Sequence, residues 1–165
     1  MADRTISERL QPSLLDRLTD ADPSKTVETR DQRVIDIRRL REIVQRDLSW
    51  LLNTTNAEPW IDPDRHPHAT RSVLNYGVLD LSGVFSTRGR TESIRASLRR
   101  SIELFEPRLR PGSLVIELQT VKGAADVVLA FDIRAEMWAE PVPLELYLRS
   151  EIDVTTGAVA VERIG

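Results

Sequence analysis

The spacing of apolar residues changes once along this chain, and the change restricts the fold more than any other feature. In two stretches, residues 34–51 and 94–105, apolar residues recur every three or four positions, which is the period of a helix with one buried face. From Ser113 onward they alternate with polar residues, which is the period of a strand buried on one side. Helices followed by such a meander predict a single α+β domain, in which N-terminal helices pack on a C-terminal antiparallel β-sheet.

Three helices are predicted before the change. A short amphipathic helix within Pro12–Leu18 has its leucines on one face. A long helix covers Asp31–Leu52, and a second long helix covers Thr91–Phe105. Thr91 is the predicted N-cap of this last helix, and Pro107 stops it because the proline ring clashes with a continuing helix.

Four strands are predicted after the change, because runs of alternating residues are separated by turn-forming glycines and prolines. Their predicted bounds are Val115–Val121, Val127–Ala135, Leu144–Val154 and Ala158–Ile164. The last strand is short and terminal, so we expect it to form an open edge on which another chain can pair its main chain. The predicted division of the chain is residues 1–22, an N-terminal segment with the short helix, and residues 23–165, the α+β domain.

Composition excludes several classes of protein. The chain has 165 residues and no cysteine, which excludes disulfides, thiolate catalysis and cysteine zinc sites. No apolar run approaches about 18 residues, and the polar start, Met1–Ser7, is unlike a secretory signal peptide. We therefore expect a cytoplasmic protein that does not insert into a membrane. The 23 Lys and Arg against 26 Asp and Glu, with few aromatic residues, do not favour nucleic-acid binding.

The loop Asp62–His68 gathers the side chains that commonly bind metals, namely Asp62, Asp64, His66 and His68. Its two histidines flank a proline, no further group of ligands is near in sequence, and the spacing matches no zinc motif. The chain also has no G-x-S-x-G elbow and no phosphate-binding glycine loop. We therefore expect neither a metal nor a cofactor.

Glu103 and Glu106 are the carboxylates that a glycoside hydrolase would use, because they lie three residues apart at a predicted helix end. A general acid at neutral pH must hold its proton, and nearby positive charge opposes this. Glu103 is close in sequence to Arg99 and Arg100, and Glu106 is close to Arg108. These neighbours make catalysis a poor fit, and a lysozyme-like peptidoglycan hydrolase is kept only as an alternative.

The tripeptide Glu106-Pro107-Arg108 has two interpretations that the residues alone leave open. In the first, the proline ends the helix, Glu106 pairs locally and Arg108 lies near the negative end of the helix dipole. In the second, the tripeptide is a rigid corner that presents a carboxylate and a guanidinium to another subunit. Arginine is concentrated in Arg88–Arg110 and acidic residues in 132–165, so different faces of the domain suit different partners.

Five blocks of the sequence carry a resemblance to a known family. The blocks are Arg9–Asp20, Arg46–Thr54, Arg71–Gly83, Phe105–Leu109 and Leu144–Arg149. In this order they resemble the TssE family of baseplate subunits from type VI secretion systems, which is part of the phage baseplate-wedge lysozyme-like family. The fourth block matches the Glu-Pro-Arg motif of the TssE family. Five blocks in register are far more specific than any one of them.

The resemblance implies the α+β fold of that family and a structural, non-catalytic role in a cytoplasmic baseplate docked at the inner membrane complex. In that role the protein bridges the wedge proteins and the base of the contractile sheath, and it helps nucleate sheath assembly. The implied partners are the wedge proteins TssF, TssG and TssK and the sheath proteins TssB and TssC, with the inner tube close by. The same fold also occurs in a stress-response anti-adaptor, so a regulatory binding module is a further alternative.

The resemblance also implies which residues bind the partner, namely Glu106, Pro107 and Arg108. Reversing the charge of Arg108 is therefore expected to abolish sheath assembly and to leave the melting temperature of the domain nearly unchanged.

Overall fold

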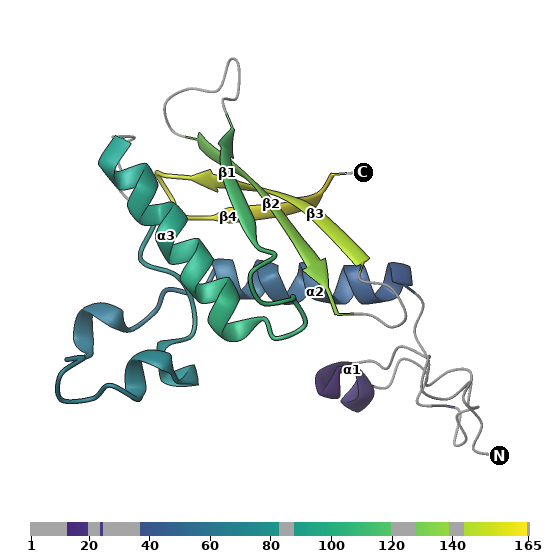
Figure 1. The fold of residues 1–165 in the computed structure, drawn as a ribbon, viewed down its shortest axis with the longest axis horizontal. Coiled ribbons are helices and arrows are strands. Elements are labelled where there is room, and N and C mark those ends of the chain that lie inside the picture. Colours follow the sequence, from purple (N-terminus) through teal and green to yellow (C-terminus); the bar gives the residue numbers. More distant parts are fainter. Residues whose placement is uncertain are drawn as a thin grey trace.

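The computed structural model of the chain describes residues 13–19, 24, 37–82, 88–119, 128–138 and 144–164. Within these residues the chain forms three α-helices, three single 3-10 turns and four strands (Figure 1). The helices are α1 (Leu14–Leu18), α2 (Ile37–Leu52) and α3 (Arg88–Phe105), and the strands are β1 (Val115–Gln119), β2 (Val128–Met137), β3 (Leu144–Asp153) and β4 (Val159–Arg163). This arrangement confirms the predicted α+β class.

The four strands form one antiparallel sheet in the order β1-β2-β3-β4, so strands that are neighbours in sequence are also neighbours in space. Alternation places one set of side chains of each strand on the core face. On β2 that set is Leu129, Phe131, Ile133, Ala135 and Met137, all of them buried. The opposite face carries charged residues, such as Arg149, whose guanidinium pairs with Asp132 on the neighbouring strand at 2.9 Å.

The long helices cover the apolar face of the sheet. In Figure 1, α2 lies near β3 and β4 and α3 lies beside β1, and the apolar residues of both helices belong to the same core as those of the sheet. The buried residues of α2 are Leu40, Ile43, Val44, Leu48, Leu51 and Leu52. Full burial of a side chain of this kind stabilises the fold by about 1.5–3 kcal/mol, so this stripe is what holds α2 in place.

Helix α3 begins earlier than the sequence pattern predicts. It starts at Arg88, so Thr91 is not its N-cap but a buried residue inside the first turns. The prediction was wrong because a threonine just before an apolar stripe can have either of two roles. Its hydroxyl can cap a helix, or its methyl group can face the core from inside the helix. The predicted stop is confirmed, since the helix ends at Phe105, two residues before Pro107.

The predicted strands agree with the structure within a few residues where they can be compared. β2 continues to Met137, two residues beyond the predicted end, and β3 and β4 match their predicted bounds within one residue. The predicted turn at Lys122-Gly123 and the prolines of Pro141–Pro143 lie outside the described residues. The same is true of the predicted boundary between residues 22 and 23 and of residues 31–36 at the predicted start of α2.

The segment between α2 and α3 extends from the body of the molecule and contains the 3-10 turns η3 (Glu58–Trp60), η4 (Ala69–Arg71) and η5 (Val73–Asn75) (Figure 1). Its base is closed by two main-chain hydrogen bonds of 2.8 Å, from Asn56 N to Val78 O and from Val78 N to Thr54 O. Gly77 makes this closure possible: its φ is +118°, and a Cβ there would lie 2.2 Å from Thr54 O.

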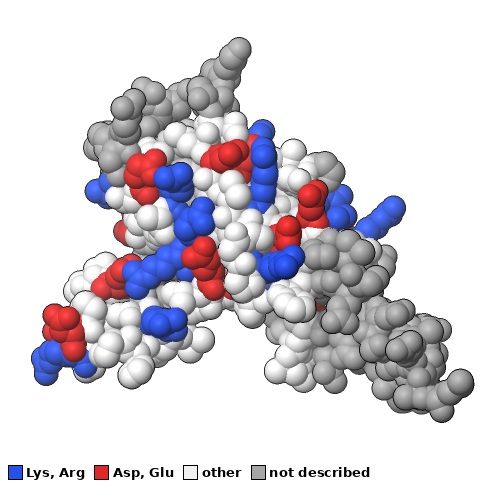
Figure 2. Space-filling model, viewed as in Figure 1, with Lys and Arg blue, Asp and Glu red and all other residues white. Residues whose placement is uncertain are grey.

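Basic and acidic side chains lie next to one another on the face shown in Figure 2. Three arginines of α3 are paired: Arg95 with Glu92, Arg99 with Glu103, and Arg100 with Glu58 of η3. These pairs are exposed, so each contributes little to stability, but they neutralise much of the arginine-rich segment that the sequence contains.

Candidate functional site

The candidate site lies where α3 ends and the chain turns toward the sheet. Pro107 cannot donate a main-chain hydrogen bond, so the helical pattern stops at Glu106, whose N–H still donates to Ile102 O at 2.9 Å. The following residues pair with the end of β2. Arg110 N donates to Glu136 O, and Trp138 N donates to Arg108 O, both at 2.7 Å. The corner Glu106–Arg108 is therefore fixed on one side by a helix and on the other by a strand.

Glu106 turns inward and is only 4% exposed. Its carboxylate accepts hydrogen bonds from three nitrogens of Arg108: the main-chain N at 3.1 Å, Nε at 2.6 Å and Nη2. Pro107 between them is exposed, and the side chain of Arg108 is 27% exposed. The structure thus realises the local pairing of Glu106 and leaves Pro107 and part of Arg108 accessible.

Arg108 also contacts α2, which the sequence did not indicate. Its Nη2 donates to Asp47 Oδ2 at 2.8 Å. The other oxygen of Asp47 accepts from Arg46 at 2.9 Å (Nε) and 2.7 Å (Nη2). Arg46 in turn donates to both oxygens of Asp16 on α1, at 2.7 and 3.2 Å. These contacts form a series of side chains of alternating charge, which we call the ion-pair chain. It joins α1, α2 and the corner, and its members in order are Asp16, Arg46, Asp47, Arg108 and Glu106.

Contacts within the ion-pair chain favour the charged forms of Asp16 and Arg108. The hydrogen bond from Arg46 lowers the pKa of Asp16 below its ordinary value, against the opposing effect of burial. Burial alone would lower the pKa of Arg108, but the hydrogen bonds and charges of Glu106 and Asp47 outweigh it and raise the pKa. Burial raises the pKa of Tyr76, and the charges of Asp47 and Glu106 raise it further. The hydroxyl of Tyr76, beside the ion-pair chain, therefore stays protonated.

A pocket of about 250 Å³ lies next to the ion-pair chain. Its lining residues are Leu15, Asp47, Trp50, Leu51, Tyr76, Phe105, Glu106 and Arg108. The rings of Tyr76 and Phe105 meet edge to face with their centres 5.3 Å apart, and the guanidinium of Arg46 lies 4.8 Å from the centre of the Trp50 ring. Nη1 of Arg108 is buried and has no hydrogen-bond partner among the residues that the structure describes. We call this space the Arg108 pocket.

Glu103 and Glu106 line a second, larger pocket of about 500 Å³ on the other side of the corner, together with Pro107 and several apolar residues. This is where a hydrolase of the kind considered above would need its acid. The carboxylate of Glu106 is, however, occupied by Arg108, and Glu103 Oε1 lies 3.4 Å from Arg99 Nη1. Both carboxylates are thus paired with arginine.

The loop with two histidines gives no metal centre among the residues that the structure describes, because no three metal-binding side chains come together there. Asp62, Asp64, His66 and His68 are all exposed. The carboxylate of Asp62 instead accepts from the main-chain N of Asp64 at 3.0 Å and of Arg65 at 3.3 Å. These bonds shape a turn.

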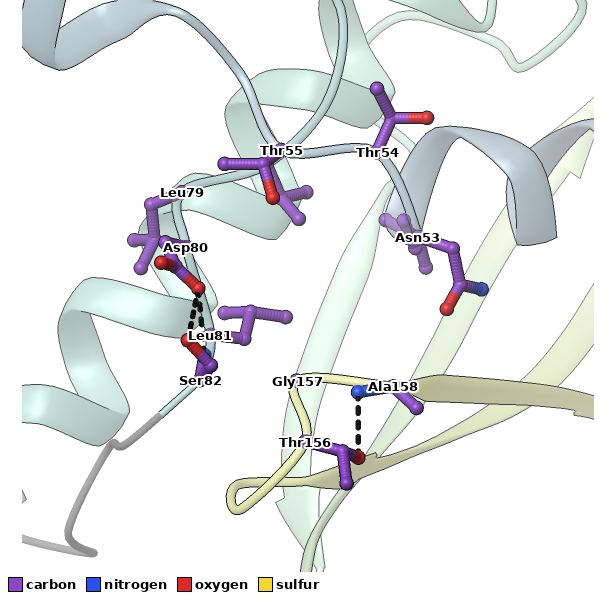
Figure 3. A pocket seen from close by; sticks show the side chains of 12 residues that line it. Asn53, Thr54, Thr55, Leu79, Asp80, Leu81, Ser82, Thr156, Gly157 and Ala158 are labelled. Carbon is purple, nitrogen blue, oxygen red and sulfur yellow. Dashed lines mark hydrogen bonds between the residues drawn. The ribbon is translucent and has the colours of Figure 1, made fainter.

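A third pocket, of about 230 Å³, lies where the end of α2 meets the β3–β4 turn (Figure 3). Its polar groups mostly bond to their own loops. Asp80 accepts from Ser82 N at 2.9 Å and Ser82 Oγ at 2.7 Å, and Thr156 Oγ1 accepts from Ala158 N at 3.3 Å. The pocket therefore lies between two turns whose polar groups bond within their own loops.

The edge of β4 is not open as the sequence suggested. Asn53, just after α2, donates to Val159 O at 2.8 Å and accepts from Val159 N at 3.0 Å. Gln45 of α2 donates to Val161 O at 2.8 Å. Side chains on and just after α2 thus bond three main-chain groups of β4, at Val159 and Val161, that a pairing strand could otherwise use. At the other end of the sheet, β1 has β2 as its only strand neighbour among the described segments.

Sequence reasoning found the corner but missed Asp16, Arg46 and Asp47. The signal was present in the blocks Arg9–Asp20 and Arg46–Thr54, each of which carries one end of the Arg46–Asp16 pair. A single sequence does not show that residues so far apart meet.

Comparison with known proteins identifies the family. The model of the family "Baseplate wedge protein gp25" matches residues 38–142, more than half of the chain, including α2, α3, β1, β2 and the corner. No match was found among the curated proteins or among the solved structures. None of the described helices is both long and apolar enough to cross a membrane. The chain belongs to the gp25 baseplate wedge family, and it is a phage baseplate-type structural component whose partners are other baseplate or tail proteins.

Proposed function

We propose that the chain is a TssE-type subunit of the cytoplasmic baseplate of a type VI secretion system. It bridges the wedge proteins TssF, TssG and TssK and the base of the contractile sheath formed by TssB and TssC, close to the inner tube, and it helps nucleate sheath assembly. The membership of the gp25 family supports the baseplate role. The five sequence blocks favour the type VI secretion branch.

The observation that carries the proposal is the construction of the corner. Arg108 is held on two sides by Glu106 and Asp47, and the exposed Pro107 fixes the main chain beside it. An arginine whose side chain is already immobilised loses little conformational entropy when it binds another protein. We assign the direct contact to Pro107 and Arg108 and assign to Glu106 the task of holding Arg108 in position. In the partner-binding motif, Pro107 and Arg108 therefore touch the partner, and Glu106 positions Arg108.

A second contact is proposed at the sheet. Because β4 is covered by Gln45 and Asn53, the strand available for main-chain pairing with a sheath strand is β1. Two apolar residues of β1, Val115 and Leu118, are exposed and would be covered by an added strand.

The experiment that tests the corner compares two conservative variants, Arg108→Lys and Arg110→Lys. Lysine keeps the charge that neutralises Glu106 but loses the planar fork that contacts two groups at once. Arg110 is the matched control because it is exposed and pairs with Glu136 on the surface. Binding of each purified variant to a TssF–TssG–TssK complex and sheath assembly in cells are measured, with a melting curve of each variant to confirm folding.

We expect Arg108→Lys to fold, to bind the wedge complex about tenfold or more weakly, and to assemble little sheath, while Arg110→Lys behaves as the parent protein. Equal binding of Arg108→Lys and the parent would contradict the proposal. Clearing of peptidoglycan in a zymogram, lost in Glu106→Gln, would support the hydrolase instead. Capture of a soluble regulator in place of wedge proteins would support the anti-adaptor alternative.

A further inference from the structure

The short helix α1 is attached to the domain by its polar side. Arg46 binds both carboxylate oxygens of Asp16, and Leu15 lines the Arg108 pocket. Leu14 and Leu18, one helical turn apart on the face away from Asp16, are 70% and 75% exposed. An amphipathic helix ordinarily buries its leucines against the body that holds it. Here the ion pair holds α1 in the opposite orientation, with its leucines outward.

The exposed leucines are continuous with the candidate site. Leu14, Leu15 and Leu18 share about a quarter of the circumference of the helix, and Leu15 is the member that reaches the Arg108 pocket. Trp50, half-exposed under Arg46, lines the same pocket. An apolar surface therefore runs from α1 across Trp50 to the pocket, and we call it the α1–Trp50 surface.

The charges around this surface determine what can bind there. In the ion-pair chain each carboxylate has a guanidinium beside it, and each guanidinium lies between two carboxylates. A charged group of a partner would find its counterpart already occupied and would lose its own hydration. Apart from members of the ion-pair chain, the pocket is lined by the apolar or aromatic residues Leu15, Trp50, Leu51, Tyr76 and Phe105. An uncharged, apolar group can cover these residues without separating any ion pair.

We propose that the α1–Trp50 surface and the Arg108 pocket form one docking surface for an uncharged, apolar segment of the partner that contacts the corner. The segment covers Leu14 and Leu18 and places an apolar side chain in the pocket. The inference rests on the proposed function, because it assigns the chemistry of the same wedge partner.

Two measurements on the full chain test this surface. The chain has no cysteine, so a single introduced cysteine reports local accessibility. The first measurement is the rate of maleimide labelling of Leu18→Cys with and without the TssF–TssG–TssK complex. Leu74→Cys of η5 is the control, because Leu74 is 74% exposed, as Leu18 nearly is. The affinity for that complex is then measured for Leu14→Ser/Leu18→Ser and for the matched pair Val73→Ser/Leu74→Ser. All four leucine and valine side chains are exposed, so the variants are expected to fold.

We expect the complex to slow labelling at Leu18→Cys and not at Leu74→Cys. We expect Leu14→Ser/Leu18→Ser to weaken binding about tenfold or more, with no change for the control pair. The inference would be overturned if Leu14→Ser/Leu18→Ser binds as tightly as the parent and the complex does not slow labelling of Leu18→Cys. The proposed function would still stand in that case, provided that Arg108→Lys binds about tenfold or more weakly than the parent. Equal losses in both pairs would also overturn it. If the parent protein does not bind the wedge complex, both the inference and the proposed function fail.

Discussion

Arg108 and Asp47 are 61 residues apart in the chain, and Nη2 of the arginine donates to Oδ2 of the aspartate at 2.8 Å. The bond joins the end of α3 to the middle of α2. It also places Asp47 between two guanidiniums, those of Arg46 and Arg108, which would otherwise repel each other. The position of the corner therefore depends on α2, although the motif itself is local in sequence.

Replacing Asp47 by Asn is expected to destabilise the protein. The variant leaves Arg46 and Arg108 near each other without the anion between them, and both are only partly exposed. We expect the free energy of unfolding to fall by about 1–2 kcal/mol, less than for a fully buried pair because water reaches the site. Urea denaturation measures the loss. Glu42→Gln, which breaks the exposed pair with Arg39, is the control and should cost about 0.5 kcal/mol or less. A loss no greater than that of the control would contradict the role given to Asp47.

Charge reversal at Arg108 is expected to destabilise the fold, contrary to the expectation from sequence. Arg108→Glu would put a third carboxylate beside Glu106 and Asp47 and would leave the buried Glu106 without its guanidinium. Breaking a buried pair in this way costs about 3–5 kcal/mol, so the melting temperature should fall markedly. Calorimetry of Arg108→Glu and Arg108→Lys measures the difference. An unchanged melting temperature for Arg108→Glu would mean that the pair with Glu106 contributes nothing to stability.

The attachment of α1 is expected to depend on pH in the acid range. The pKa of Asp16 in the folded protein is below its ordinary value of 3.8, so its contribution is present above that value and is lost as the pH falls through the folded pKa. NMR chemical shifts of Leu15 and Trp50 should therefore be constant near neutral pH and change below the ordinary value. Asp16→Asn removes the titrating group and is expected to show the released shifts at every pH. Shifts of the parent that do not move in acid would exclude the ion pair as the attachment.

Removing the side chain of Asn53 is expected to expose the edge of β4. Asn53→Ala leaves both the N–H and the carbonyl of Val159 without their partners, whereas Gln45→Ala frees only the carbonyl of Val161. We expect losses of about 2 and about 1 kcal/mol respectively in the free energy of unfolding, measured in urea. Light scattering of concentrated samples should rise for Asn53→Ala, because an open edge pairs with other chains. A clear solution together with unchanged stability would contradict the covering of β4.

The class of the fold was predictable because it depends on local periodicity. The apolar stripe that ends in Leu48 and Leu51 defines α2, and the alternation through Leu129, Phe131 and Ile133 defines β2. Pro107 marked the end of α3 because the constraint it imposes is independent of the rest of the fold. Thr91 misled because the residue type fits a cap and a buried position equally well, and only packing decides between them.

The site was predictable only in part. The tripeptide could be located, and its resemblance to a family motif gave it a role, but the direction in which Glu106 faces depends on where α2 passes. Asp47, Asp16 and Asn53 act on residues far away in the sequence, and no local pattern specifies such pairs. Their contacts appear only when the helices and the sheet are placed together.

The side chains of Gln45 and Asn53 also influence at which edge of the sheet another molecule can add a strand. A protein with two free edges can be inserted anywhere in a growing row of strands, and rows of that kind lengthen without limit. With three main-chain groups of β4 bonded to Gln45 and Asn53, the described part of the sheet is better suited to accept a strand beside β1 than beside β4. Such a subunit suits the first place in a row better than a place within it.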